Sequence, residues 1–420
     1  MGSPAGKPLS IRRNMIWNSA GSLTYLGCQW LITVLVVRLS PNYDAAGVLA
    51  VAMSVSNLFA PIALYKIRAY QVSDVHEEIP SGVYVGFRFV TIAIAFVVVL
   101  VYAVLTCALS ALPCVILYLV FRAGDNFIDV LHGIDQQHYR LDYSGISMAL
   151  RGVLFLVAFS AVLSLTGCLE LAVLAMSLVT YPVVFFDVWA AGSLASVRPV
   201  FDSGRFALLL RACLPAVIGM FANNLVVTFA RQYLGLELGD AALGVYASIS
   251  TPVVLIQACS NYVYAPLLGV FAERLDQRDE AGFRALLLRV FAAFLLIFVG
   301  GSVAFVFCGK WFLGFVFGAG IVQHADLIYA ALLSCSITAC SAFLSDLLVA
   351  MRQMHWNLIG NVVSCVVSAP LTVFLVRAFG MNGTSYSIAL SFGVGVAIML
   401  GRVFSCSKRL CRSREQWRDG

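Results

Sequence analysis

The sequence predicts an all-α polytopic membrane protein with twelve transmembrane helices. Apolar runs of about twenty residues recur along nearly the whole chain, the length that a helix needs to cross the hydrocarbon core of a bilayer. Hydrophobic residues make up 61% of the chain and charged residues only 11%, which leaves no room for a water-soluble domain. Apolar runs such as 97–101 do not alternate as barrel strands would, so helices are the expected spanning element.

Each expected helix is a long apolar run bounded by charged residues, glycine, proline or a short polar turn. The turns at Pro113 and at Thr166-Gly167 are the weakest boundaries, since little else separates the helices there. The expected helices are residues 15–37, 43–65, 82–107, 111–133, 144–166, 169–191, 207–231, 241–268, 285–309, 326–350, 357–378 and 382–404.

The placement of Lys and Arg predicts the orientation. With the N-terminus inside, the cytoplasmic segments collect most of these residues, and we count Arg151 among them. An even number of helices then places both termini in the cytoplasm. The net charge of +6 reflects this bias, so it does not indicate a nucleic-acid partner. The first apolar run is too long for a signal-peptide core, and we expect it to be retained.

Two short echoes predict an internal repeat. Asp-Ala-Ala opens the second helix of each half, at Asp44 and at Asp240. An Asp, a Gln and a His recur with identical spacing at the ends of the fourth and tenth helices, at 129, 136 and 138 and at 346, 353 and 355. We therefore expect two six-helix bundles related by a parallel pseudo-twofold repeat.

This repeat divides the chain into four parts. Residues 1–195 form an N-terminal six-helix lobe, and 196–206 form a cytoplasmic linker. Residues 207–404 form a C-terminal six-helix lobe, and 405–420 form a basic cytoplasmic tail. A cavity between two such bundles is a natural place for a substrate.

Polar side chains follow helical stripes within the apolar runs. Charged groups at membrane depth are costly and need a partner or water. One interpretation is that the stripes face a water-filled cavity, and the other is that they bridge neighbouring helices. Arg122 is able to pair locally with Asp125, and Arg88 is able to reach lipid phosphates at the cytoplasmic surface. The cavity candidates are Arg88, Arg122, Asn18, Gln29, Asn224, Arg231, Gln257 and Asn261.

The arginines favour an anionic, phosphate-bearing substrate, because the guanidinium fork suits phosphate oxygens. Asp125, Asp129 and Asp346 are candidate carriers of a coupling ion, Na⁺ or H⁺. No nucleotide-binding loop and no His-Glu-x-x-His motif is present. The 12 cysteines are scattered and lack metal-ligand spacing, which favours packed free thiols. We expect no enzyme activity, no metal and no cofactor.

Three stretches carry a resemblance to a known family. They are the opening of the first helix at 13–21 with Asn14, Trp17 and Asn18, the loop at 67–74, and the exit of the fourth helix at 133–140. Gly380-Met381-Asn382-Gly383 agrees in the second half. The chain resembles the Wzx-type polysaccharide flippases of the multidrug/oligosaccharidyl-lipid/polysaccharide (MOP) exporter superfamily, which also contains the MATE transporters.

The resemblance implies a flippase of the bacterial cytoplasmic membrane. Its substrate would be an undecaprenyl-diphosphate-linked oligosaccharide, moved by alternating access for polysaccharide export. By the resemblance, Arg88 and Arg122 would contact the diphosphate. Membrane lipids are partners, a polysaccharide polymerase is a candidate partner, and a monomer is expected. The related lipid II flippases carry arginines within their first and eighth helices, whereas no charge lies between Arg13 and Arg38 here, which disfavours lipid II.

Two other functions stay open. A MATE-like drug or cation antiporter has the same fold and would have an acidic cavity, while this chain offers both signs of charge. An integral membrane glycosyltransferase or polysaccharide polymerase would need a large outer loop with catalytic Arg, Asp or His, and the longest outer loop expected here is the short one around 310–324.

Overall fold

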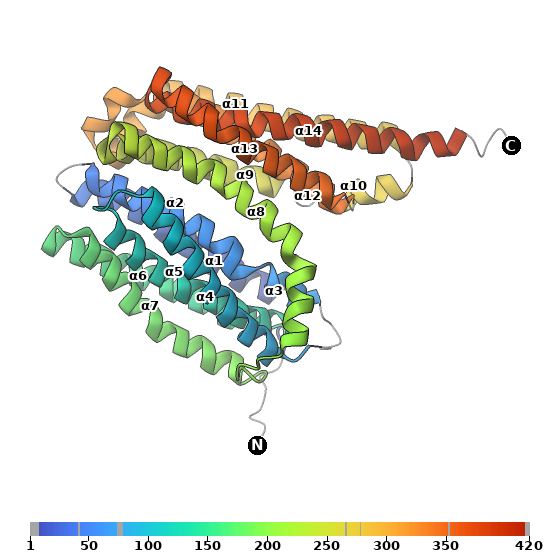
Figure 1. The fold of residues 1–420 in the computed structure, drawn as a ribbon, viewed down its shortest axis with the longest axis horizontal. Helices are drawn as coiled ribbons and strands as arrows, with labels where there is room; N and C mark the ends of the chain where they lie inside the picture. Colours follow the sequence, from blue (N-terminus) through green and yellow to red (C-terminus); the bar gives the residue numbers. More distant parts are fainter. Residues whose placement is uncertain are drawn as a thin grey trace. The chain divides into compact units, whose positions relative to one another are not determined.

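The computed structural model describes residues 8–40, 43–73, 79–264, 267–277, 279–351 and 353–415 of the chain. These residues form helices joined by short connections, and the described parts contain no strand (Figure 1). The helices are α1 (Ile11–Leu39), α2 (Asp44–Leu64), α3 (Ile67–Ser73), α4 (Ser81–Thr106), α5 (Leu112–Gln137), α6 (Leu141–Thr166), α7 (Leu169–Gly192), α8 (Ser203–Leu238), α9 (Asp240–Tyr264), α10 (Leu267–Asp276), α11 (Glu280–Phe317), the 3₁₀ helix η1 (Ala319–His324), α12 (Leu327–Ala350), α13 (Met354–Phe379) and α14 (Met381–Glu415).

Every one of the twelve predicted spans coincides with a long helix. Within the described residues, ten of these helices are long and apolar enough to cross a membrane. The other two are α5 and α9, and α5 carries Arg122, Asp125 and Asp129 in its middle part. The protein is a multi-pass, all-helical membrane protein, as the sequence predicts. The short helices α3 and α10 were not predicted.

The chain divides into two compact units, Met1–Val217 and Ile218–Gly420. The division falls inside α8, two residues after Pro215. The predicted linker 196–206 lies just before it, and α8 already begins within that linker, at Ser203. At the other end of the chain, α14 runs through the predicted tail as far as Glu415.

The two units repeat the same order of long and short α-helices and several of the same helix pairs. Each has two long helices, one short helix and four more long helices. In the first unit α2 packs on α4 and α5, and α7 packs on α5 and α6. In the second unit α9 packs on α11 and α12, and α14 packs on α12 and α13. This correspondence confirms the internal six-helix repeat that the two echoes predict.

Glycines let α1 and α6 approach closely in the first unit. A Cβ added to Gly21 would lie 2.3 Å from the carbonyl oxygen of Gly145, and one added to Gly145 would lie 2.3 Å from that of Trp17. Small residues at such crossings allow helix backbones to meet within a membrane. One turn further along α1, this contact brings Tyr25 against α5 and α6.

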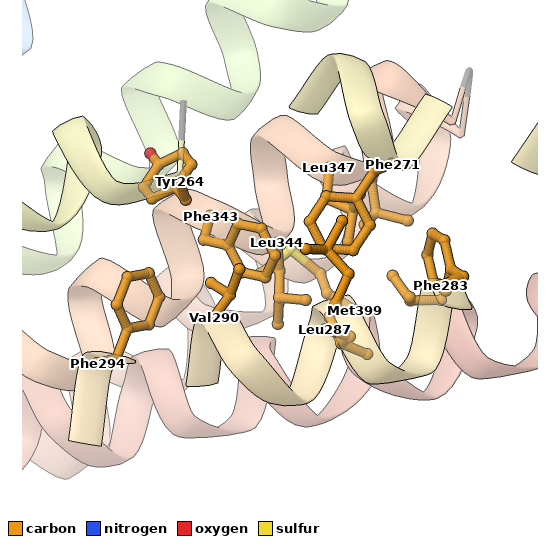
Figure 2. Packing of buried hydrophobic residues seen from close by; sticks show 13 residues of the cluster. Tyr264, Phe271, Phe283, Leu287, Val290, Phe294, Phe343, Leu344, Leu347 and Met399 are labelled. Carbon is orange, nitrogen blue, oxygen red and sulfur yellow. The ribbon is translucent and has the colours of Figure 1, made fainter. Parts of the chain in front are cut away.

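An aromatic core holds the second unit together. Phe343 on α12 is fully buried, and its ring lies 5.3 Å from that of Tyr264 and 5.7 Å from that of Phe271 (Figure 2). Phe294 on α11 adds an edge-to-face contact with Phe343 at 5.9 Å, and Met399 on α14 fills the gap beside them. Aromatic contacts of this geometry add to the energy of burial, so α9 to α12 and α14 share one core.

Candidate functional site

The polar face of α5 carries the charged groups of the first unit. Arg122, Asp125, Asp129 and Gln136 follow one another at spacings of three, four and seven residues, which places them along one side of the helix. Asp125 is close to the helix midpoint. With a rise of about 1.5 Å per residue it lies about 20 Å from either end of α5, so it would lie near the middle of the bilayer if α5 spans it, as the sequence predicts.

Asp125 is the centre of a buried cluster from three helices, which we call the Asp125 cluster. Arg122 Nη1 donates a hydrogen bond to Asp125 Oδ2 at 2.6 Å. The Tyr25 hydroxyl of α1 donates to the same oxygen, and Arg151 Nη1 of α6 donates to Oδ1. Gln29 Nε2 then donates to the Tyr25 hydroxyl at 3.2 Å. The predicted candidates Arg122, Asp125 and Gln29 therefore meet in one site.

This cluster carries an excess of positive charge. One carboxylate serves two guanidiniums, so the three groups have a formal charge of +1. The Asp125 side chain is 8% exposed and that of Arg151 is 5% exposed, while that of Arg122 is 19% exposed. The Nε atoms of both arginines are buried and have no hydrogen-bond partner in the described structure. The arginines therefore keep unused donors at membrane depth.

Aromatic rings hold the Asp125 cluster in place. The Arg151 guanidinium lies 5.3 Å from the centre of the Tyr25 ring, within cation–π range. The Tyr25 ring meets Phe155 edge to face at 5.4 Å, and Phe155 meets Phe121 in the same way at 5.7 Å. Both phenylalanines are fully buried, which fixes Tyr25 and Arg151 around the carboxylate.

The structure places Arg151 differently from the sequence prediction. We assigned it to the cytoplasmic charges, but it is the eleventh residue of α6 and is buried against α5. Sequence position alone hid it, because its partner Asp125 lies 26 residues earlier on another helix.

A second cluster lies one turn further along α5, around Asp129. Arg68 Nη1 of α3 donates to Asp129 Oδ1 at 3.2 Å, and Arg88 Nη2 of α4 donates to Oδ2 at 2.9 Å. Arg68 Nη2 also donates to Gln136 Oε1 at 3.1 Å. This cluster again has two guanidiniums on one carboxylate.

The geometry gives Arg88 a structural role. Its side chain is fully buried, and Arg88 Nη1 donates to the carbonyl oxygen of Ala63 at 2.8 Å. Thr91 Oγ1 donates to the same oxygen at 2.8 Å. Ala63 lies in the last turn of α2, where helix carbonyls lack partners and a cation is favourable. Arg88 joins α2, α4 and α5, and both its terminal nitrogens are engaged, so we leave it out of the proposed substrate site.

A third buried group was missed by sequence reasoning. His132 Nε2 of α5 lies 3.3 Å from Asp187 Oδ1 of α7, and Ser147 Oγ of α6 donates to Asp187 Oδ2 at 2.7 Å. Asp135 accepts a hydrogen bond from Ser144 at 2.8 Å. The only signal in the sequence was the continuation of the α5 stripe through position 132.

Asn14, a polar residue near the start of α1, bridges helices. Asn14 Nδ2 donates to the carbonyl oxygens of Leu9 and Tyr139, and Asn14 Oδ1 accepts from the backbone N–H of Leu141 at 2.8 Å. Asn14 thus ties the start of α1 to the turn between α5 and α6. Asn18, one turn later, is half-buried.

The second unit has a different polar interior. Among the described residues, the buried charged side chains belong to the first unit. The buried polar side chains of the second unit are mostly Ser and Thr on α9 and α12 to α14. Arg231 on α8 is half-buried, and its Nε has no hydrogen-bond partner within the described structure. It lies in the neighbourhood of Tyr246 of α9 and Cys335 of α12.

The remaining candidates come from α8, α9 and α12. Asn224 is half-buried on α8, and Asp346 on α12 accepts a hydrogen bond from Tyr264 at 2.9 Å. The side chains of Gln257 and Asn261 lie outside the described residues. No group of three or more His, Cys, Asp or Glu side chains suited to a metal ion occurs in the part of the chain that the structure describes.

Comparison with known proteins gives the same fold. No protein-family model matches the chain. A structure of the lipid II flippase MurJ in an inward closed conformation superposes with a TM-score of 0.72 at 10% identity, over 94% of this chain and 90% of that one. An inward-facing multidrug resistance MATE transporter of the MOP superfamily gives 0.68 at 14% identity, over 91% and 95%. The chain has the fold of the MOP transporters.

A curated relative has a similar length. The capsular polysaccharide biosynthesis protein CapF of Staphylococcus aureus is 20% identical over 371 residues, which is 87% of this chain and 92% of that protein. A MOP transporter from Pyrococcus furiosus, described as having a binding pocket of reverse polarity, has a TM-score of 0.57 at 16% identity over 95% of this chain and 96% of that one. The resemblance to MOP exporters and to a polysaccharide protein therefore holds along most of the chain.

Proposed function

We propose that this protein is a flippase that moves a polyprenyl-diphosphate-linked oligosaccharide from the inner to the outer leaflet of the bacterial cytoplasmic membrane. The observation that supports it most strongly is the Asp125 cluster, which places two guanidiniums on one carboxylate at membrane depth. Arginine forks bind phosphate oxygens through several charge-assisted hydrogen bonds. The likeness to CapF supports a polysaccharide precursor as the cargo.

The task of such a protein is to give the head group a polar route. A diphosphate and its sugars cannot enter hydrocarbon without a large desolvation cost. The Asp125 cluster supplies cationic donors for the diphosphate. The prenyl tail stays in the lipid while the two units expose the site to each side in turn.

The sign of the charge separates this proposal from a drug or cation antiporter. An organic cation would need a site with a net negative charge, whereas the Asp125 cluster has a formal charge of +1. MOP-fold neighbours include multidrug transporters, so fold alone does not choose between the two functions. We propose transport rather than enzyme catalysis, with both termini in the cytoplasm and a monomer as the working unit.

The test is flipping in vesicles. Purified protein is reconstituted with a fluorescent polyprenyl-diphosphate oligosaccharide, and outward movement is followed by quenching of the exposed label. Arg122→Gln and Arg151→Gln should each slow flipping by about tenfold or more, since a charge-assisted hydrogen bond contributes about 1.5–3 kcal/mol. Arg377→Gln, at the exposed end of α13, is the matched control and should flip at the wild-type rate. Wild-type rates in both cluster variants, with normal folding, would refute the proposal.

A further inference from the structure

The Asp125 carboxylate is bound by two guanidiniums, which are groups that also bind phosphate oxygens. Its Oδ1 accepts from Arg151 and its Oδ2 accepts from Arg122, so each oxygen binds a different guanidinium. A phosphate group offers more oxygens and more negative charge to the same two forks. The Arg122 side chain is 19% exposed, which leaves part of it open to an incoming anion.

From this geometry, and resting on the function proposed above, we propose that Asp125 is a built-in competitor of the substrate diphosphate for Arg122 and Arg151. In the empty transporter the carboxylate holds both guanidiniums. When the diphosphate arrives it displaces the carboxylate, and when the head group reaches the outer side the carboxylate returns and helps to release it.

The empty transporter needs such a counter-ion. Two unpaired guanidiniums at the midpoint of α5 would carry a charge of +2 in a region where charge is costly. Asp125 lowers the formal charge of the cluster to +1 while the substrate is absent. The transporter is then able to return to the inward-facing state without carrying an uncompensated pair of cations.

Tyr25 provides a place for the displaced carboxylate. Its hydroxyl donates to Asp125 Oδ2, and it is held by Gln29 from the same helix. Because Tyr25 lies on α1, this hydrogen bond is independent of both arginines. A buried carboxylate without any partner would be costly, so Tyr25 lowers the energy of the displaced state.

Asp129 does not share this role. Its partner Arg88 is fully buried and also bound to the backbone of Ala63, whereas the side chain of Arg122 is 19% exposed. An incoming anion would have to break the Ala63 contact to reach Arg88. The other partner of Asp129, Arg68, is 30% exposed but also donates to Gln136, so both arginines of this cluster are tied to a second group.

The test is binding of farnesyl diphosphate, a soluble short-chain probe, to the purified full-length protein. Asp125→Asn removes the competing charge and keeps the size of the side chain. Since close charge pairs have coupling energies of about 1.5 kcal/mol or more, this variant should bind the probe about tenfold more tightly than wild type and release it more slowly. Asp142→Asn, which removes a carboxylate bound to Arg140 in the turn between α5 and α6, is the matched control and should bind as wild type does.

Tyr25→Phe gives an independent readout. It removes the partner of the displaced carboxylate, so it should weaken probe binding several-fold in wild type and have no effect when combined with Asp125→Asn. If Asp125→Asn does not fold, Tyr25→Phe alone still tests the inference. Unchanged or weaker binding in folded Asp125→Asn, or unchanged binding in Tyr25→Phe, would overturn it.

Failure of this inference is distinguishable from failure of the proposed function. If Arg122→Gln and Arg151→Gln weaken probe binding while Asp125→Asn leaves it unchanged, the diphosphate site stands and the competition is wrong. If neither arginine variant affects the binding of the probe, the proposed site itself fails.

Discussion

At the scale of single residues, Arg88 and Arg122 show how two embedded arginines acquire different roles. Both bind an aspartate of α5, but Arg88 also binds the backbone of α2 and is fully buried. Arg122 is partly exposed and donates to Asp125 on its own helix. The first geometry stabilises the unit, and the second leaves donors for a ligand.

We therefore predict that Arg88→Met lowers the stability of the protein and leaves the flipping rate of the folded molecules unchanged. Removing one partner of a buried ion pair leaves Asp129 with Arg68 alone and should cost about 3 kcal/mol. Thermal unfolding in detergent should show a lower Tm than that of wild type, with Arg377→Met as the exposed control. The protein that remains folded should flip substrate at the wild-type rate per molecule. A wild-type Tm with lost flipping would place Arg88 in the substrate site instead.

The sequence predicted residue contacts only where the partners are close in the chain. Arg122 and Asp125 are three residues apart on one helix, and their pairing was one of the two interpretations offered. Tyr25 and Arg151 reach the same carboxylate from α1 and α6. Nothing in a single sequence shows which faces of distant helices meet. The sequence analysis therefore counted Arg151 among the cytoplasmic charges, although its side chain is buried inside the first unit.

At the scale of elements, the crossing of α1 and α6 decides whether the Asp125 cluster can form. Gly21 and Gly145 allow the backbones to approach, and the same crossing carries Tyr25 and Arg151 toward each other. The glycines of α1 are not equivalent, because a Cβ at Gly27 would have no atom within 4 Å.

We predict that Gly21→Val impairs flipping and that Gly27→Val does not. The valine at position 21 would clash with the backbone of α6 and force the helices apart, at a cost of about 1–3 kcal/mol. A Cβ at position 27 has free space around it, so Gly27→Val is a control for the effect of placing a valine on α1 without a clash. Tm and flipping rate are the measurements, and equal effects at both positions would contradict this account of the crossing.

The elements were largely predictable, and the exceptions have physical causes. Long apolar runs place twelve helices, because length and hydropathy decide which segments span a membrane. The short helices α3 and α10 lack such a run. Their formation depends on packing against the neighbouring long helices, as for α3 on α5 and α10 on α11 and α12, and this packing is not visible in the local sequence.

At the scale of the whole molecule, the internal repeat combines two units with the same order of long and short α-helices and different interiors. The first unit buries arginines and aspartates, while the polar groups buried in the described part of the second are mostly hydroxyls. The repeat was predictable from two short echoes. The division of polar roles was not, because it depends on which side chains point inward.

The proposed substrate predicts a response to membrane potential. An inside-negative potential of 100 mV favours the outward movement of negative charge, and moving two uncompensated negative charges outward releases about 4–5 kcal/mol. Vesicles given such a potential with valinomycin and a potassium gradient should flip the substrate faster than vesicles without it. A rate that does not depend on the potential would show that the charge is fully compensated during transport.

The most direct test of the central claim is an experimental structure of the protein with farnesyl diphosphate bound. The account predicts phosphate density within hydrogen-bonding distance of the Arg122 and Arg151 guanidiniums, with the Asp125 carboxylate turned away from them toward Tyr25. Phosphate density at another place, with Asp125 still bound to both arginines, would contradict it.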